Sequence, residues 1–343
     1  MKKVLLISPY DHNGSISGSL VRMGALENYL EDNGTKVTIA ASRKDIFNKI
    51  DYFTDMSSIF NRFVTWLHLL WLVNYKRHDF VISEFPLPLF SLWRNVHFVL
   101  HDMKVLNKKV TRSNNQVRKI LLKLCIRLSK KTITVSKTQR ELIIKNFGVH
   151  GSKIISSYNG FEKEQLIFMR QARKSKDRNG YCYISNYTKH KGHNDLLRAV
   201  NKSNSDANVT FIGSDLGYQD DVHSLAEKLQ LKINYKKNIS EVEKYRILAK
   251  CQYFVFPSHY EGFGIPLLEG FLSGCTVICT DLDVFGELLT ERQAIFYPIG
   301  EVDALSEKLH CKTTKILESE YLDIEERHNW KNIFDELLRE INV

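Results

Sequence analysis

The sequence predicts an α/β fold built from two doubly wound parallel sheets, and three observations lead to this prediction. A chain of 343 residues is long enough for two domains, at about 150 residues per domain. Short, continuous apolar runs, typical of strands buried on both faces, alternate with amphipathic helical patterns. The alternation starts again after a polar, charged stretch at residues 170–179, which we interpret as a linker or boundary. Two such halves predict two sheets facing one another.

The first half begins with a strand, a loop, a helix and a second strand. Val4–Ser8 is a buried strand, residues 11–19 form a loop rich in Gly, Ser and Asn, and apolar spacing predicts a helix over Leu20–Glu31. Gly34 ends this helix, and Val37–Ala41 is the second strand, which is expected to run parallel to the first. Further strands are expected at Phe80–Ser83, Val96–His101 and Thr132–Ser136, and helices at Gln116–Ser129 and Lys137–Asn146.

The second half repeats this alternation. Its expected strands are Tyr181–Ser185, Val209–Gly213, Tyr253–Pro257 and Thr276–Thr280. Its expected helices are Asp195–Val200, Val222–Leu229, Glu241–Ala249 and Pro266–Leu272. A charged amphipathic helix over Ile324–Ile341 is expected to close the chain.

Composition bounds the class of protein. Lys and Arg number 49 and Asp and Glu 39, and the resulting net charge of +10 indicates an anionic partner such as a phosphorylated substrate, a membrane surface or a nucleic acid. The six cysteines form no CxxC pair, and we expect no signal peptide, which together predict a reducing cytoplasm. No run of about 18 apolar residues marks a membrane span.

Two loops of the first half carry candidate binding residues. The segment Asn13–Ser19, with Gly14 and Gly18 before a helix, could offer backbone N–H groups to an anion. It matches neither a dinucleotide fingerprint nor a P-loop, and a plain surface loop is the alternative. His101-Asp102 stands at the carboxyl end of a strand, where open α/β sheets place ligand sites. The alternative is a strand-end histidine capped by its neighbour.

A third segment, Ser185–His193, also follows a strand and opens a helix. Lys191 is placed to meet a phosphate at that helix start. His190 and His193 have the spacing of a metal-binding pair. No third ligand is near them in the sequence, so we do not expect a metal there.

The most informative segment is Phe256–Gly270. A strand ends at Pro257, a Gly-rich loop follows, and Pro266 suits the first turn of a helix. Glu261 lies in the loop and Glu269 in the helix, and two carboxylates also fit the acid/base pair of a glycosidase. A helix N-terminus favours the charged form of a carboxylate, which suits a hydroxyl acceptor better than a proton donor. The Asp281-Leu-Asp283 motif is interpreted as a solvated loop rather than a metal site.

The run Glu261-Gly-Phe-Gly-Ile-Pro-Leu-Leu-Glu269 resembles the E-x7-E signature of family-four retaining glycosyltransferases with the GT-B fold. Weaker similarities follow in the family's order, at Ser17-Gly18, Gly34, His101-Asp102, Ser136, Tyr158-Asn-Gly160 and Lys191-Gly192. The resemblance therefore covers nearly the whole chain. It implies two Rossmann-like doubly wound domains facing each other across a cleft. We expect an acceptor-side domain at residues 1–165, a nucleotide-sugar domain at 166–323, and a helix at 324–343 that crosses back onto the first domain.

The resemblance also implies roles for individual residues. His101 would contact the donor sugar near the reacting centre, Lys191 would neutralise the leaving diphosphate, and Glu261 would bind sugar hydroxyls. Glu269 would bind the ribose hydroxyls. Further contacts with the nucleotide sugar are expected from Ser17, Gly18, Asn186, Gly262, Phe263 and Gly264.

The implied chemistry needs no cofactor and no metal, because lysine and helix N-termini neutralise the diphosphate. Two positions depart from the family pattern. Asn186 stands where the family often has an arginine on the phosphates. Gly270 stands where it usually has alanine, which would cost the helix about 1 kcal/mol.

The expected function is a cytoplasmic, retaining glycosyltransferase of the hexosyltransferase type. It would move a sugar from a UDP-, GDP- or ADP-linked donor to a glycan acceptor, a lipid-linked intermediate of bacterial lipopolysaccharide or capsule synthesis. Alternatives are a glycan phosphorylase or sugar-phosphate synthase on the same fold, or a non-catalytic glycan- or partner-binding protein, which Asn186 favours. A nucleic-acid partner is not expected, because the basic residues lack interleaved aromatics.

A basic segment predicts a peripheral position on the inner face of the plasma membrane. Residues 103–140 hold twelve Lys or Arg residues and no Asp or Glu, and each basic residue near an anionic leaflet contributes about 1 kcal/mol. Trp66 and Trp71 on a neighbouring apolar stretch also suit a membrane interface. The alternative is a solvated helix face with both tryptophans in the core.

Overall fold

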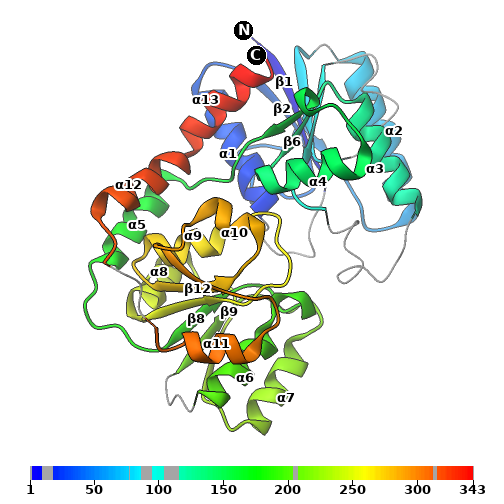
Figure 1. Cartoon of the computed structure of the whole chain (residues 1–343). Helices are drawn as coiled ribbons and strands as arrows, with labels where there is room; N and C mark the ends of the chain where they lie inside the picture. The colour runs from blue at the N-terminus through cyan, green and yellow to red at the C-terminus, as the bar shows by residue number, and fades with distance from the viewer. Residues whose placement is uncertain are drawn as a thin grey trace. The chain divides into compact units, whose positions relative to one another are not determined.

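The computed structural model describes residues 2–9, 18–76, 78–85, 95–103, 116–203, 208–311 and 315–342. The chain forms two compact units (Figure 1). Unit 1 comprises Met1–Gly160 and Trp330–Val343, and unit 2 comprises Phe161–Asn329. The units therefore divide at residues 160/161 and 329/330, not at the expected 165/166 and 323/324.

Unit 1 is built on a parallel sheet whose strand order within the described residues is β3-β2-β1-β4-β5-β6-β7. The strands are β1 (Lys3–Ser8), β2 (Lys36–Ala41), β3 (Tyr52–Phe53), β4 (Phe80–Ser83), β5 (Val96–Leu100), β6 (Lys131–Thr134) and β7 (Ile154–Ser156). The helices are α1 (Gly18–Asp32), α2 (Ile59–Tyr75), α3 (Gln116–Leu128), α4 (Lys137–Phe147) and α13 (Trp330–Glu340). The order reverses between β1 and β4, and ligands of such sheets bind outside the strand ends at this switch point.

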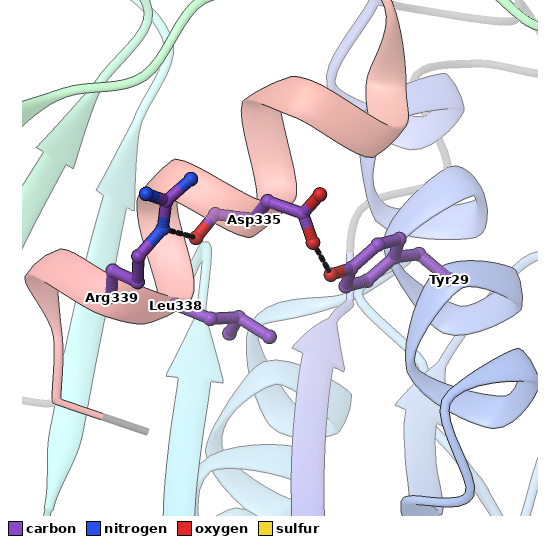
Figure 2. Close-up of a pocket in the computed structure, with 4 residues that line it drawn as sticks. All are labelled: Tyr29, Asp335, Leu338 and Arg339. Atoms are coloured by element: carbon purple, nitrogen blue, oxygen red, sulfur yellow. Dashed lines mark hydrogen bonds between the residues drawn. The ribbon is translucent and has the colours of Figure 1, made fainter.

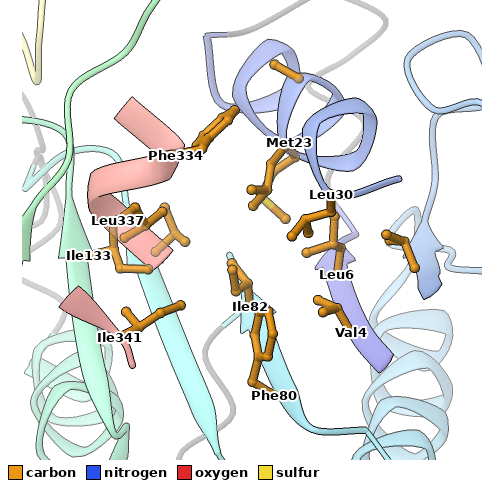
Figure 3. Packing of buried hydrophobic residues seen from close by; sticks show 14 of the residues in the cluster. Val4, Leu6, Met23, Leu30, Phe80, Ile82, Ile133, Phe334, Leu337 and Ile341 are labelled. Atoms are coloured by element: carbon orange, nitrogen blue, oxygen red, sulfur yellow. The ribbon is translucent and has the colours of Figure 1, made fainter. Parts of the chain in front are cut away.

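The core of unit 1 follows from strand alternation. Val4 and Leu6 of β1 point to one face of the sheet, where Phe334 of α13 joins the same cluster (Figure 3). Leu5 and Ile7 point to the other face and pack with buried residues of α2. Residues buried on both faces explain why β1 is a continuous apolar run rather than an alternating one.

The expected helix over Ile324–Ile341 is wrong, because the chain forms two helices there, α12 (Glu318–Arg327) and α13. The carbonyl of His328 accepts a hydrogen bond from the backbone N–H of Phe161, at 2.8 Å. A continuous helix would use that carbonyl for its own ladder. The break separates α12, in unit 2, from α13, in unit 1.

Helix α13 packs on α1 of unit 1. The hydroxyl of Tyr29 donates to the Asp335 carboxylate, and burial, followed by this hydrogen bond, raises the pKa of Tyr29 to about 12. Tyr29, Asp335, Leu338 and Arg339 line a shallow pocket beside this contact (Figure 2). Arg339 Nε donates to the Asp335 backbone carbonyl at 3.0 Å within α13, so among these polar groups the Tyr29–Asp335 hydrogen bond is the one that joins the two helices.

Unit 2 has a parallel sheet with the order β10-β9-β8-β11-β12-β13 within the described residues. The strands are β8 (Tyr181–Ile184), β9 (Val209–Ile212), β10 (Ile233–Lys236), β11 (Tyr253–Phe256), β12 (Thr276–Thr280) and β13 (Ala294–Tyr297). Besides α12, the helices are α5 (Lys163–Arg173), α6 (His193–Lys202), α7 (Gln219–Lys228), α8 (Glu241–Lys250), α9 (Ile265–Leu272), α10 (Asp283–Leu288) and α11 (Val302–Lys308). This order places a switch point between β8 and β11.

The expected linker at residues 170–179 is partly wrong, because its first residues form the last turn of α5. Arg170 Nε donates to Glu325 Oε2 at 2.7 Å, and Arg173 Nη1 lies 3.3 Å from Glu325 Oε1. The charges that resembled a linker therefore pair α5 with α12 inside unit 2.

Candidate functional site

The switch point of unit 2 brings Lys191 and Glu261 into contact. Lys191 follows β8 on a short 3₁₀ turn, and Glu261 lies in the loop after β11. Lys191 Nζ donates to Glu261 Oε1 at 2.6 Å, with 19% of the lysine side chain and 12% of the glutamate side chain exposed. The two residues that the sequence assigned to the diphosphate and to the sugar thus form one partly shielded ion pair.

Backbone contacts hold these two loops together. The backbone N–H of His259 donates to the carbonyl of His190 at 2.8 Å. Gly192 has φ +71°, and a Cβ on it would lie 2.1 Å from the carbonyl oxygen of Pro257. Only glycine allows this approach. On the same loops, His259 Nε2 lies 2.5 Å from Asp195 Oδ2.

His193, one of the two histidines considered for a metal, lies in an aromatic environment. His193 is fully buried, and its ring stacks on Tyr187 with 4.6 Å between centroids and lies 4.7 Å from Tyr183. Burial, and then the charge of Lys191, lowers the pKa of His193 to about 3. His193 is therefore a neutral residue of an aromatic core.

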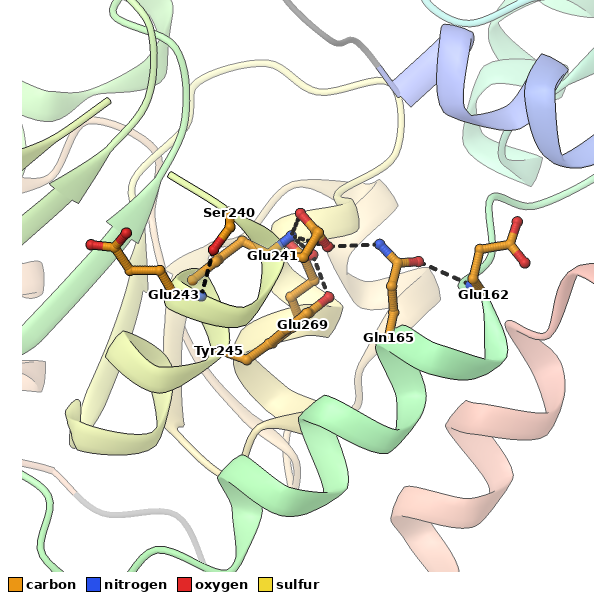
Figure 4. Close-up of polar contacts among 8 residues, drawn as sticks. Glu162, Gln165, Ser240, Glu241, Glu243, Tyr245 and Glu269 are labelled. Carbon is orange, nitrogen blue, oxygen red and sulfur yellow. Dashed lines mark hydrogen bonds and ion pairs between the residues drawn. The ribbon is translucent and has the colours of Figure 1, made fainter. Parts of the chain in front are cut away.

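Glu269 is buried and already paired. Its Oε1 accepts hydrogen bonds from Lys244 Nζ at 2.6 Å and from the Tyr245 hydroxyl at 3.0 Å, both on α8 (Figure 4). Lys244 also contacts Glu241 Oε1 at 2.7 Å. Burial lowers the pKa of Lys244, but the carboxylates of Glu269 and Glu241 outweigh it and raise the pKa overall. The sequence analysis missed Lys244, whose only signal was a basic residue early in an expected helix.

The remaining predicted residues of unit 2 lie around the two loops. Asn186 Oδ1 accepts from the backbone N–H of Ser214 at 3.1 Å, so the residue in the arginine position joins the loops after β8 and β9. Gly262 is half-buried, and Phe263 is buried with its ring 5.7 Å from that of His328. Gly264 precedes α9. The nucleotide-sugar contacts expected of these residues stay predictions.

The Asp281-Leu-Asp283 motif has a structural use. Asp281 Oδ1 accepts from the backbone N–H of Ile299 at 3.1 Å, and Asp283 begins α10. Within the described ranges, no three His, Cys, Asp or Glu side chains are grouped as metal ligands would be.

The strand ends of unit 1 carry a second cluster. His101 Nε2 lies 2.6 Å from Glu84 Oε1, and the Ser8 hydroxyl donates to Glu84 Oε2 at 2.5 Å. The partner of His101 is thus a residue after β4, and sequence reasoning missed it because Glu84 precedes His101 by 17 residues. Gly18 is the first residue of α1, while Ser17 and Gly14 lie outside the described residues.

Comparison with known proteins gives these sites a family context. Residues 164–333, which lie almost entirely in unit 2, match the family model for glycosyl transferases group 1. The chain is 26% identical over 239 residues to the O-antigen chain mannosyltransferase RfbU of Salmonella typhimurium, covering 69% of this chain and 65% of the relative.

A second relative is the N-acetylgalactosamine-N,N'-diacetylbacillosaminyl-diphospho-undecaprenol 4-alpha-N-acetylgalactosaminyltransferase of Campylobacter jejuni. The chain is 28% identical to it over 171 residues, covering 49% of this chain and 46% of the relative. The matched part thus spans less than two-thirds of the length of either relative.

A solved structure covers the whole chain. HepE of Anabaena in complex with UDP and glucose matches with a TM-score of 0.77 and 13% identity, over 100% of both chains. At this identity the likeness concerns the fold alone, and together with the two Rossmann-like units it confirms the predicted GT-B fold. The family model and the named transferases support a glycosyltransferase.

Proposed function

We propose that this protein is a retaining glycosyltransferase that transfers a sugar from a nucleotide sugar to a lipid-linked intermediate of cell-surface polysaccharide synthesis. The observation that carries the proposal is the ion pair of Lys191 and Glu261 at the switch point of unit 2. It lies within the segment that matches the group 1 family. The names of the two relatives, an O-antigen mannosyltransferase and a transferase acting on a diphospho-undecaprenol glycan, support the choice of acceptor.

In this proposal the two members of the ion pair change partners when the donor binds. In the proposed complex the diphosphate replaces Glu261 as the partner of Lys191, and the released carboxylate accepts hydrogen bonds from sugar hydroxyls. Lysine supplies a compact charge for a phosphate group. As bond cleavage leaves more charge on the diphosphate, the ammonium stabilises it, and in this proposal no metal is needed for that purpose.

Glu269 is assigned to the ribose. The hydrogen bonds from Lys244 and Tyr245 both go to its Oε1. In the proposed complex Oε2 accepts from the ribose hydroxyls. His101 keeps the contact with the donor sugar that the resemblance implies.

A thermal-shift screen with UDP-, GDP- and ADP-sugars tests the nucleotide part. A ligand at 100 times its dissociation constant stabilises a protein by about 2.7 kcal/mol, so one nucleotide series should raise Tm clearly. Proton NMR of the product formed with that donor then gives the anomeric configuration. An inverted product would exclude the retaining mechanism, and a protein that neither binds nor turns over any nucleotide sugar would exclude the proposal.

We place the acceptor side on an anionic membrane, through helices α2 and α3. Four apolar residues at helical spacing on α3 are strongly exposed: Val117, Ile120, Leu121 and Leu124. Arg118, Lys119, Lys123 and Arg127 belong to the same helix, which has no acidic residue. An apolar stripe with basic neighbours is the pattern of a helix that lies in a membrane interface.

Helix α2 adds a second exposed apolar stripe. Phe60, Phe63, Val64, Leu67 and Trp71 follow helical spacing and are 73%, 56%, 46%, 45% and 44% exposed. The buried sides of α2 and α3 pack on β1 and β5 through Ile7 and Phe98. These strand residues point to the same face of the sheet, so α2 and α3 cover that face of unit 1 (Figure 1).

Two observations reduce the number of basic residues in segment 103–140 that we assign to the membrane. Lys131 Nζ and Arg140 Nε donate to backbone carbonyls, of Ser152 at 2.7 Å and Ile154 at 3.0 Å, so these cations serve unit 1 itself. Lys104, Lys108, Lys109 and Arg112 lie outside the described residues. Within the described part of the chain, no helix combines the length and apolar character needed to cross a bilayer.

Co-sedimentation with phosphatidylglycerol vesicles, and with neutral phosphatidylcholine vesicles as a comparison, tests this placement. Binding should occur only to the anionic vesicles and should weaken in 1 M salt, where the Debye length falls to about 3 Å. Changing Lys119, Lys123 and Arg127 to Glu should abolish it. The matched control changes Lys228, Lys232 and Lys237 of unit 2 to Glu. Equal loss in both variants, or dimerisation through this face without vesicle binding, would reject the membrane as the partner.

A further inference from the structure

The switch point of unit 1 collects three polar side chains from three neighbouring strands. Ser8 ends β1, Glu84 follows β4 and His101 follows β5. Ile7 pairs with Ser83 across β1 and β4, and Ser83 pairs with Phe98 across β4 and β5. The register therefore places the three residues side by side where a doubly wound sheet holds its ligand.

The hydrogen bonds fix which atoms carry protons. An ionised carboxylate only accepts hydrogen bonds, and Glu84 receives one on each oxygen, from Ser8 at 2.5 Å and at the Nε2 side of His101 at 2.6 Å. Nε2 must then carry the proton that bridges to Glu84. Among the described residues, Nδ1 of His101 has no hydrogen-bond partner in this network.

Glu84 and His101 differ in how far their side chains are exposed to solvent. The side chain of Glu84 is only 3% exposed, whereas that of His101 is 23% exposed. The carboxylate is therefore part of the interior, and the imidazole is the group that a ligand could reach. A buried carboxylate needs compensation, and here Ser8 and His101 supply direct donors.

A buried cation also acts on Glu84. Arg22 is 1% exposed and donates to the carbonyls of Ser157, at 3.0 Å, and Tyr158, at 2.6 Å. Burial lowers the pKa of Arg22 to about 10, and the charge of Glu84 opposes that lowering. The guanidinium also donates to the Ser157 hydroxyl at 2.7 Å and to Asn159 Oδ1 at 3.5 Å. Its hydrogen bonds therefore go to the segment 157–159, and it offsets the charge of Glu84 without competing for its oxygens.

We propose that Glu84 is a positioning residue that holds His101 in one ring orientation and one tautomer, with Nδ1 turned to the substrate as a hydrogen-bond acceptor for a sugar hydroxyl. Ser8 in turn fixes the rotamer of Glu84. The inference rests on the proposed function, which assigns His101 to the donor sugar. An orienting carboxylate behind a histidine is a general device of enzyme sites.

The tautomer is tested in the unliganded protein by ¹⁵N NMR of histidine-labelled chain, with His101→Gln used to assign the signal. The expected result is a neutral ring protonated on Nε2 and unprotonated on Nδ1. A ring protonated on Nδ1, or a rapid mixture of both tautomers, would overturn the inference. This measurement needs no donor, so it decides the matter even if the assigned transferase reaction is wrong.

Kinetics test the consequence for the reaction. Glu84→Gln keeps the shape but offers an amide N–H that competes for Nε2. We expect kcat to fall about 100- to 1000-fold, the range for losing one preorganised hydrogen-bonding group at the reacting centre, with little change in donor KM. The double variant with His101→Ala should be no slower than His101→Ala alone, because Glu84 acts through the ring. Additive losses would overturn the inference.

Two further variants guard against a folding artefact. Ser8→Ala removes a single hydrogen bond to Glu84 and should slow turnover about 10-fold, again without effect in the His101→Ala background. Glu141→Gln changes an exposed carboxylate of α4 in the same unit and should leave turnover unchanged. An unchanged donor-induced Tm shift in Glu84→Gln would show that unit 2 still binds its nucleotide.

Discussion

Replacing Lys191 by methionine keeps the length and apolar stem of the side chain and removes only the ammonium. In the resting protein that ammonium is 2.6 Å from Glu261 Oε1, and both side chains are largely shielded from solvent. When the donor binds, the proposed partner changes from a carboxylate to a diphosphate. The substitution therefore tests the contribution of the Lys191 ammonium alone.

The size of the effect follows from this partial shielding. Two unit charges about 4 Å apart interact by about 4 kcal/mol at an effective dielectric constant near 20, against about 1 kcal/mol in bulk water. A loss of 2.7–4 kcal/mol in the transition state is about a 100- to 1000-fold drop in kcat, which is also the usual cost of losing one such electrostatic donor. Asn186 supplies no charge on the same loop, so we expect the upper part of this range.

Steady-state kinetics with the donor found by thermal shift measure the drop, and calorimetry with free nucleoside diphosphate measures binding. Lys189→Met is the matched control, because Lys189 is exposed on the same 3₁₀ turn, and its turnover should stay within about threefold of wild type. The reasoning is refuted if Lys191→Met retains turnover within about tenfold of wild type. If Lys189→Met is then the slow variant, the phosphate role belongs to Lys189.

Four other substitutions separate function from folding. Glu261→Gln should mainly lower kcat, whereas Glu269→Gln should weaken nucleotide binding in calorimetry and lower Tm, because it removes a carboxylate from buried Lys244. Gly270→Ala would put a Cβ 2.4 Å from Cγ of Phe254. Urea unfolding should therefore show a free energy of unfolding lower by about 1–3 kcal/mol, because the core is overpacked. A variant more stable than wild type would contradict this. The pKa of His193 is about 3 in the folded protein, against about 6.5 in the unfolded chain. Between these pH values the unfolded chain binds more protons, so the free energy of unfolding decreases by about 1.4 kcal/mol for each unit by which the pH falls. His193→Phe, followed by unfolding at several pH values, should flatten that loss, and an unchanged slope would assign the acid sensitivity elsewhere.

The sequence could predict nine of the thirteen strands found in the described residues because the signal of those nine is local, whereas β3, β7, β10 and β13 were not expected. Buried parallel strands such as β1 and β11 are continuous apolar runs, and the chain direction and connection rules then order them. The helix expected over 324–341 failed for a non-local reason, since its break depends on a hydrogen bond to Phe161. The hydrophobic periodicity of the sequence gives no signal of that contact.

The candidate site divides in the same way. Lys191 and Glu261 could be found because each stands in a recognisable loop after a strand. Lys244 and Glu84 could not, because their importance comes from partners 25 and 17 residues away. Gly270 was interpreted as a small loss of helix stability, but the ring of Phe254 occupies the space that an alanine would need. The glycine is thus matched to a large neighbour on β11.

A common arrangement recurs at three carboxylates of the two units. Before any substrate arrives, Glu261 contacts Lys191, Glu269 contacts Lys244 and Glu84 contacts His101. The last two pairs hold a carboxylate that is at most 5% exposed, so separating them would leave a buried charge without a partner, which is costly. The carboxylate of Glu261 is more exposed, at 12%, so an anionic ligand can take its place beside Lys191 at lower cost. Exposure of the carboxylate therefore distinguishes the pair that we propose exchanges with the donor from the two pairs that hold their own units in shape.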